Sequence, residues 1–210
     1  MTTAVNLAVI YYSSTGTGTA IANEIAIAAE EAGAVVRVRK VAELAPQVAI
    51  DSNLAWAAHH AATADVPAPT EDDLSWADAI IYGSPTRFGN VASQLKQHLD
   101  TLSSLWQTGA LADKVYSGFT STATLHGGHE STLLALYNTF HHFGGVIVPP
   151  GYTSPVKFVD GNPYGTSHHA VAGSEPGDIG DDTRNAARHQ AERVVGIARA
   201  LKQGSAKRAV

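Results

Sequence analysis

The segment of residues 5–33 constrains the fold more strongly than any other part of this sequence. Residues 5–12 form a hydrophobic run rich in β-branched and aromatic side chains, as expected of a buried parallel strand. Hydroxyl-bearing and glycine residues follow, and apolar residues then recur at helical spacing until Gly33, which is typical of a helix C-cap. The pattern predicts a strand, a tight turn and a helix, which form the first unit of an α/β sheet.

The turn of residues 13–18 has the chemistry of a phosphate-binding site. A helix N-terminus presents unpaired backbone N–H groups and the positive end of the helix dipole, both of which attract anions. Glycine lets the backbone approach the phosphate oxygens, and hydroxyl groups add further donors. In and beside the turn these residues are Ser13, Ser14, Thr15, Gly16, Thr17, Gly18 and Thr19. An ordinary tight βα turn is the alternative interpretation.

Two better-known phosphate loops are excluded by their residues. No Gly-Lys-Ser or Gly-Lys-Thr ends the turn, which excludes a nucleoside-triphosphate P-loop. The dinucleotide fingerprint is incomplete, because no third glycine follows Gly16 and Gly18 at the required spacing. Because the turn offers hydroxyls and amides but no lysine, we predict a terminal monophosphate as its ligand.

Length and charge limit the organisation and the partners of the chain. With 210 residues we expect a single domain over residues 1–202 and a flexible basic tail over 203–210. The formal net charge of −5 gives no support to a nucleic-acid partner. The absence of cysteine excludes disulfides, thiolate metal sites and cysteine nucleophiles. With no apolar run long enough for a bilayer and no signal-like start, we expect a cytoplasmic protein without a membrane partner.

Further hydrophobic runs predict strands over residues 35–41, 77–82, 114–119 and 145–149. Helices are expected between them and at residues 54–62 and 183–202, and Asn90 is expected to cap the helix after the third strand. Five strand–helix pairs in sequence predict an α/β fold with a doubly wound five-stranded parallel sheet, of order 2-1-3-4-5, and helices on both faces.

Three of the predicted loops have unusual compositions. Residues 13–18, 83–89 and 120–128 follow the first, third and fourth strands and are rich in glycine and hydroxyl-bearing residues. Ligands of such sheets bind beyond the carboxyl ends of the strands, where the strand order reverses. We therefore predict that these three loops enclose one ligand. Residues 150–182 are predicted to be a long loop rich in glycine and proline, of the kind that is usually functional or disordered.

Histidine residues lie close together in the sequence at residues 59–60, 126–129 and 168–169. His59 and His60 have no third ligand at a useful spacing, so we interpret them as a solvated pair. His126, His129 and Glu130 have a metal-like spacing, and we interpret them as polar loop residues, as we do the pair at residues 168–169. We therefore predict no metal site.

The same loops resemble those of a known family. Ser13-Ser14-Thr15-Gly16-Thr17 is similar to the FMN phosphate loop of flavodoxin-like proteins. More narrowly, the sequence resembles the WrbA-type NAD(P)H:quinone oxidoreductases from residue 5 to about residue 201. The motifs that carry this resemblance are Gly83-Ser84-Pro85-Thr86-Arg87-Phe88-Gly89-Asn90, Leu105-Trp106, Val146-Ile147-Val148-Pro149 and Asn162-Pro163-Tyr164-Gly165. The resemblance implies a flavodoxin fold, FMN as cofactor, a homotetramer, and two-electron reduction of quinones by NADH or NADPH.

By position, the resemblance also assigns residues to FMN and to the substrate side of the flavin. The FMN-binding residues are Ser13, Ser14, Thr15, Gly16, Thr17, Gly18, Pro85, Thr86, Arg87, Phe88, Gly89, Ser121, Thr122, Ala123, Thr124, Gly127 and Gly128. Trp106 and His141 match positions that line the substrate side. Thr15 stands where the family often has a tyrosine, and the loops at residues 119–130 and 143–145 are longer than usual.

The positions of Trp106 and His141 predict a shared site. At a rise of 1.5 Å per residue, about ten helical residues place His141 on the order of 15 Å from its own loop at residues 121–128. We therefore expect a neighbouring subunit to supply both side chains. A ping-pong hydride transfer through flavin N5 is the predicted mechanism. The alternatives are a flavodoxin-type one-electron carrier and a non-catalytic flavin-binding interaction protein.

Overall fold

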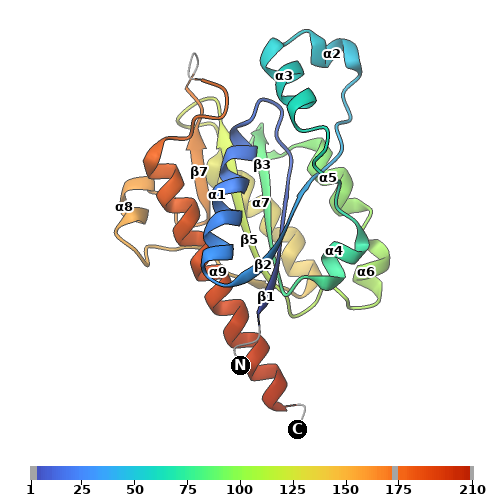
Figure 1. Ribbon diagram of the computed structural model, residues 1–210, viewed down its shortest axis with the longest axis vertical. Helices are drawn as coiled ribbons and strands as arrows, with labels where there is room; N and C mark the ends of the chain where they lie inside the picture. The colour runs from blue at the N-terminus through green and yellow to red at the C-terminus, as the bar shows by residue number, and fades with distance from the viewer. Residues whose placement is uncertain (1–3, 172–174, 209–210) are drawn as a thin grey trace.

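The computed structural model describes residues 4–171 and 175–208 and has a parallel sheet at its centre (Figure 1). Along the sheet the strand order is β2-β1-β3-β5-β6, and all of these neighbours pair in parallel. The strands are β1 (Val5–Tyr11), β2 (Ala34–Lys40), β3 (Ala79–Arg87), β5 (Val115–Thr122) and β6 (Val146–Ile147). The doubly wound fold and its 2-1-3-4-5 order are therefore confirmed.

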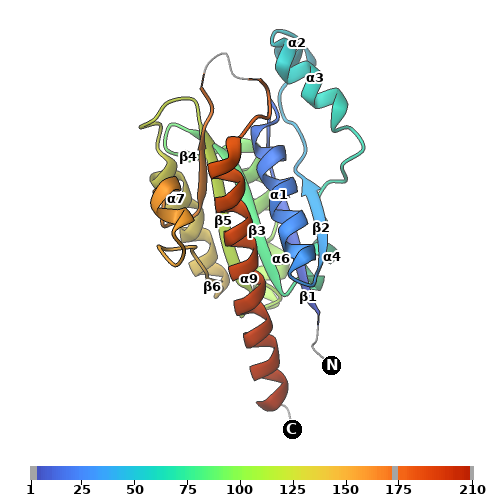
Figure 2. The ribbon, with the colours of Figure 1, turned by 60° about the vertical axis from the view of Figure 1, so that its left-hand side comes forward.

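Helices cover both faces of the sheet, because successive residues of a strand point to opposite sides. Leu7 and Val9 belong to the core beneath α1 (Thr17–Glu31) and α9 (Gly180–Arg208), which lie side by side in Figure 2. Ala8 and Ile10 belong to the opposite core, which is covered by α4 (Glu71–Trp76), α5 (Ser93–Asp100), α6 (Ser103–Gln107) and α7 (His129–Phe143).

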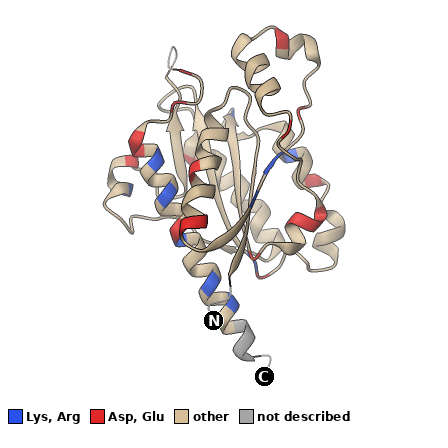
Figure 3. Ribbon diagram, in the orientation of Figure 1, with Lys and Arg blue, Asp and Glu red and all other residues tan. Residues whose placement is uncertain are grey.

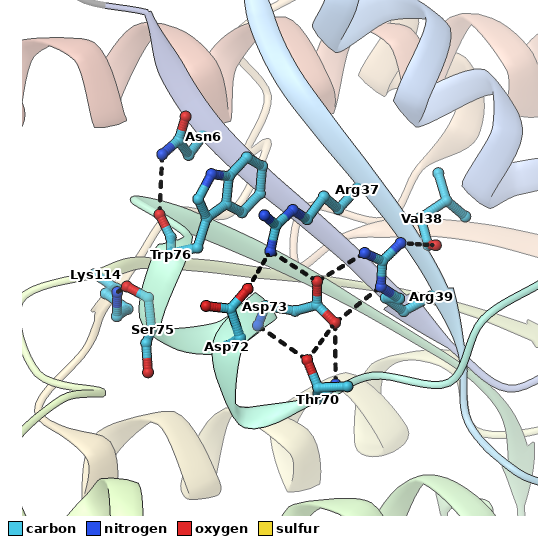
Figure 4. Close-up of polar contacts among 10 residues, drawn as sticks. All are labelled: Asn6, Arg37, Val38, Arg39, Thr70, Asp72, Asp73, Ser75, Trp76 and Lys114. Carbon is cyan, nitrogen blue, oxygen red and sulfur yellow. Dashed lines mark hydrogen bonds and ion pairs between the residues drawn. The ribbon is translucent and has the colours of Figure 1, made fainter.

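Charged side chains connect the helices at the surface. Acidic residues of α1 face basic residues of α9 in Figure 3, and Arg184 pairs with Glu24 at 3.1 Å. At the edge of the sheet, Asp73 accepts hydrogen bonds from Arg37, Arg39 and Thr70 (Figure 4). Burial raises the pKa of Asp73, but the bonds from Arg39 and Thr70 outweigh that effect and lower the pKa to about 2. This carboxylate joins α4 to the edge strand β2.

The fifth position of the sheet is shared by two short strands. β6 pairs with the first residues of β5, whereas β7 (Thr166–His169) pairs in parallel with Phe119–Thr122 near its end. Between them, residues 148–165 leave the sheet and include α8 (Val156–Asp160). The prediction of one long loop over residues 150–182 is therefore wrong, since α8, β7 and the first residues of α9 all lie within it.

Other boundaries also differ from the prediction, and residues 120–122, which we expected in the third loop, belong to β5. β3 continues through residues 83–87 and then turns into β4 (Asn90–Val91), so Asn90 lies in a strand and does not cap a helix. The N-cap of α5 is Ala92, whose amide donates to the Ser84 hydroxyl at 2.8 Å. α9 continues to Arg208, so residues 203–208 are helical where we expected a flexible tail, and residues 209–210 lie outside the described residues.

The helices α2 (Gln47–Asp51) and α3 (Leu54–Ala62) stand apart from the two layers in both ribbon views. No side chain of α3 is buried. Glu43, at the base of this segment, accepts hydrogen bonds from the Tyr12 hydroxyl at 2.7 Å, the Trp56 indole at 3.0 Å and the Gln94 amide at 2.6 Å. Polar contacts therefore hold α3 near the carboxyl end of β1.

Candidate active site

The three predicted loops meet at the carboxyl ends of β1, β3 and β5, where they form a cleft of about 340 Å³. Its lining residues are Ser13, Ser14, Thr15, Thr17, Gly18, Pro85, Thr86, Arg87, Ser121, Thr122, Ala123, Thr124, Gly127 and Ala170. Most of the residues that the sequence assigned to the cofactor are thus brought together. Four others that it assigned, Gly16, Phe88, Gly89 and Gly128, lie in the same loops but are not among the lining residues.

The first loop leaves the start of α1 open to a ligand. Gly16 precedes the helix and has a φ of +108°, a backbone conformation that residues other than glycine rarely adopt. The Ser13 hydroxyl accepts a hydrogen bond from the Gly16 amide at 3.1 Å and so closes the turn. No side chain in the described part of the chain caps α1. Its first N–H groups are therefore available to an anion that binds beside the hydroxyls of the loop.

The second loop is the hairpin between β3 and β4. Thr86 fixes it, because its hydroxyl accepts from the Gly89 amide at 3.2 Å and from the Thr132 hydroxyl at 2.8 Å. At the tip, Phe88 is fully exposed and has φ of +54°. Such a backbone costs on the order of 1–2 kcal/mol for a residue with a side chain. Phe88 thus holds an exposed aromatic ring at the tip of the hairpin, one residue after the cleft-lining Arg87.

The third loop begins at Thr122 and is supported from below by His129. The Thr122 hydroxyl donates to the Thr124 carbonyl at 2.6 Å, so the His129 Nε2–H, at 2.8 Å, donates to the Thr122 oxygen. His129 is the first residue of α7 and is buried, where we expected a polar loop residue. The Ala170 amide donates to the Thr122 carbonyl at 2.8 Å, which places Ala170 at the cleft. Sequence reasoning missed Ala170 because β7 lies in the segment predicted as a loop.

His59 contacts the first loop from outside the cleft. Its Nδ1 lies 3.1 Å from the Ser14 carbonyl oxygen, and its Nε2 lies 2.7 Å from the Thr19 hydroxyl oxygen. Burial, followed by the charge of Lys40, lowers the pKa of His59. The interpretation of His59 as part of a solvated pair is therefore wrong. No sequence signal joins it to the loop, because it lies 45 residues from Ser14 and in a different helix.

Trp106 and His141 lie on another part of the surface. The Trp106 indole donates to the His142 carbonyl at 2.8 Å, and 55% of the residue is exposed. His141 lines a second cleft of about 680 Å³, together with Leu134 and Tyr164. Neither Trp106 nor His141 lines the cleft that the three loops form in the same chain.

Residues 5–158 match the family described as NADPH-dependent FMN reductase, and this range includes all three loops. The chain belongs to this family. The FMN reductase family member described here is 49% identical over 196 residues to an NAD(P)H dehydrogenase (quinone) of Deinococcus radiodurans, which covers 93% of this chain and 96% of the relative. It is 43% identical over 200 residues to a protein of the same name from Azorhizobium caulinodans, with 92% and 96% covered.

Solved structures agree with this assignment. This FMN reductase family member superimposes on a flavodoxin, WrbA-like protein from Agrobacterium tumefaciens with a TM-score of 0.67 and 26% identity, over 94% of this chain and 99% of the other. A flavodoxin from the Archaea has the same fold, with a TM-score of 0.58 at 15% identity, over 92% and 98% of the two chains.

The described residues contain neither a metal-binding cluster nor a membrane-spanning helix. Within residues 4–171 and 175–208, no group of three or more His, Cys, Asp and Glu side chains lies where it would hold a metal ion. No helix in the described ranges has the length and apolar composition required to cross a membrane.

Proposed function

We propose that this protein reduces quinones with NADH or NADPH through FMN bound in the cleft of the three loops. The observation that carries the proposal is the open N-terminus of α1, which faces a turn of hydroxyls and glycines at the reversal of strand order. Bound FMN supplies the hydride chemistry, and the protein supplies position and electrostatics. The names of the two quinone dehydrogenase relatives support the reaction.

The residues of the first loop fit a terminal phosphate. The amides and hydroxyls of residues 13–17 would hold its oxygens, and Gly18 keeps the turn tight. A Cβ on Gly18 would lie 3.0 Å from the Tyr12 carbonyl and 3.2 Å from the Ser13 Cβ, so a larger residue would push the turn apart. The chain has no second glycine motif for the adenylate half of FAD, which favours FMN.

The other two loops fit the ring system of the flavin. Residues 85–87 would flank the ring, and Arg87 places a cation at the cleft. Backbone N–H groups of residues 121–128 and the N-terminus of α7 would stabilise negative charge on the pyrimidine side of the ring. A helix dipole contributes about 0.3–1 kcal/mol to such charge and more where water is excluded.

The substrate side would be completed by a second subunit of a homotetramer. Trp106 and His141 do not line their own cleft, while Leu134 beside His141 is 46% exposed. A neighbouring copy that covers this surface would place the two side chains over the exposed edge of its partner's flavin. His141 would then donate a hydrogen bond or a proton to a quinone oxygen.

One experiment tests the proposal. The purified protein is titrated with FMN, followed by the flavin absorbance, and then supplied with NADH and benzoquinone. We expect bound FMN and NADH consumption that depends on the quinone. A protein that binds FMN but never oxidises NADH would contradict the enzymatic function and support a non-catalytic interaction protein. A one-electron carrier would take up dithionite electrons in two separate stages.

A further inference from the structure

His59 makes one hydrogen bond to the turn of residues 13–18, called the phosphate turn below, and one to the first turn of α1. A carbonyl oxygen only accepts hydrogen bonds, so the contact of Nδ1 with the Ser14 carbonyl requires a proton on Nδ1. In the neutral ring, Nε2 then accepts a hydrogen bond from the Thr19 hydroxyl. One contact lies in the turn and the other in the first turn of α1, so the imidazole joins the two segments that would surround a phosphate.

The first contact sets the direction of a backbone N–H. In a trans peptide the C=O and the following N–H point to opposite sides of the chain. A Ser14 carbonyl held by His59 therefore turns the Thr15 N–H away from α3. Ser14 and Thr15 both line the cleft, whereas His59 does not. The bond thus prepares an N–H donor for an anion in the cleft.

The way in which α3 is attached points to a role in the site. This helix has no fully buried side chain and only partly buries Trp56 and His59, so it adds little to the hydrophobic core. It is held by polar contacts of Trp56 with Glu43, Thr63 with Lys40, and His59 with the phosphate turn. Among these three contacts, only that of His59 reaches the turn.

The charges around His59 make it sensitive to an anion. Residues 13–19, which comprise the turn and Thr19 of α1, contain no Lys, Arg or His. In addition to burial, the charges of Lys40 in β2 and of the neighbouring His60 lower the pKa of His59. Glu43 in turn raises the pKa of Lys40. The hydroxyl of Tyr11 in β1 lies beside Thr19, which His59 contacts. Burial and then Lys40 lower the pKa of His59, which favours the neutral imidazole before a ligand binds.

A phosphate group changes this balance, since it carries a charge of about −1.5 to −2 near neutral pH. When the phosphate is bound in the cleft, its negative charge favours the protonated form of His59 over the neutral form. Once protonated from solvent, Nε2–H donates to the Thr19 oxygen, and the Thr19 hydroxyl proton is free to bond elsewhere.

We propose that His59 is a positioning residue for the phosphate: it holds the Ser14–Thr15 peptide in the binding orientation and gains a proton as the phosphate binds. The inference rests on the proposed FMN site and adds to it a residue outside the cleft. It predicts that His59 matters for FMN but not for riboflavin, which has the same ring system without the phosphate.

The test measures flavin affinity rather than activity. The unliganded protein is titrated with FMN and with riboflavin at pH 6, 7 and 8, with quenching of flavin fluorescence as the signal. His59→Ala should weaken FMN binding about tenfold, as expected for the loss of a hydrogen bond that supports a charged group. His59→Asn retains a donor for the Ser14 carbonyl and should recover most of the affinity at pH 8 but not at pH 6. Riboflavin affinity should change less than twofold.

The ratio of variant to wild-type dissociation constants should rise as the pH falls, because only the wild type gains the proton. The titration of the FMN phosphate is common to both proteins and cancels in this ratio. Trp56→Phe is the matched control, since it removes another anchor of α3 without touching the turn. The proposal is wrong if His59→Ala weakens FMN and riboflavin equally, or no more than Trp56→Phe does. If the wild type binds riboflavin and FMN equally well, or neither, the proposed FMN site fails as well.

Discussion

Replacement of Glu43 by glutamine should destabilise the protein by about 2 kcal/mol at pH 7. One carboxylate oxygen accepts from Tyr12 and Trp56, and the other accepts from Gln94 and from the amides of Leu44 and Ala45. Whichever oxygen becomes an amide nitrogen, at least two donors lose their acceptor. The same contacts determine the pKa of Glu43. Burial raises this pKa, but the hydrogen bonds from Ala45, Tyr12 and Gln94 outweigh burial and lower it from 4.5 to about 2.

The magnitude follows from that pKa. A fall from 4.5 to about 2 corresponds to roughly 3 kcal/mol, because one pKa unit is worth about 1.4 kcal/mol. Glu43 is only partly buried, and solvent screening reduces this figure to about 2 kcal/mol. Because the folded-state pKa is depressed, the stabilisation is complete above pH 4.5 and is lost as the pH falls through about 2.

Urea unfolding at pH 7 and pH 3, followed by tryptophan fluorescence, measures this difference. The free energy of unfolding should differ by about 2 kcal/mol between wild type and Glu43→Gln at pH 7, and by less than half of that at pH 3. Glu30→Gln is the control, because Glu30 is exposed on α1 and its replacement should change stability by less than about 0.5 kcal/mol. Equal stability of Glu43→Gln and wild type at pH 7 would refute the reasoning.

Three further predictions concern the proposed reaction. Mass spectrometry of the released chromophore should find FMN, and FAD as the main species would contradict the assignment. Initial rates at several fixed quinone concentrations should give parallel double-reciprocal lines, because the two substrates take turns at one flavin face; intersecting lines would indicate a ternary complex. Mixed tetramers of Thr15→Glu with a variant lacking Trp106 and His141 should regain activity, because some mixed sites combine intact halves. Confirmed mixed tetramers without activity would exclude a shared site.

The sheet was predictable because its central strands β1, β3 and β5 are largely buried and appear in the sequence as hydrophobic runs. The meeting of the three loops was predictable because loops that follow the carboxyl ends of neighbouring parallel strands lie at the same edge of the sheet. The extension of β3 was not, because Gly83 reads as a break in isolation. In the fold a Cβ at Gly83 would lie 1.9 Å from the Phe119 ring, so this glycine allows two neighbouring strands to pack.

Other features depended on contacts that sequence patterns do not report. β7 has the sequence Thr-Ser-His-His, which lacks the apolar alternation of a strand, and it is held by pairing with the end of β5. His59 reaches the phosphate turn across the fold, and its neighbours in sequence resemble any alanine-rich helix. In both cases tertiary contacts determine the role of the residues.

Because the fifth position of the sheet is divided between β6 and β7, the length of the segment between them does not determine where Ala170 lies at the cleft. Residues 148–165 leave β5 after β6 and return to the same strand as β7, and each part is held by its own pairing. A longer or shorter segment here would therefore start and end at the same places, and Ala170 would still arrive at the cleft. Substitutions at the exposed residues Phe158 and Val159 of this segment would therefore change the surface offered to another molecule while the three loops keep their positions.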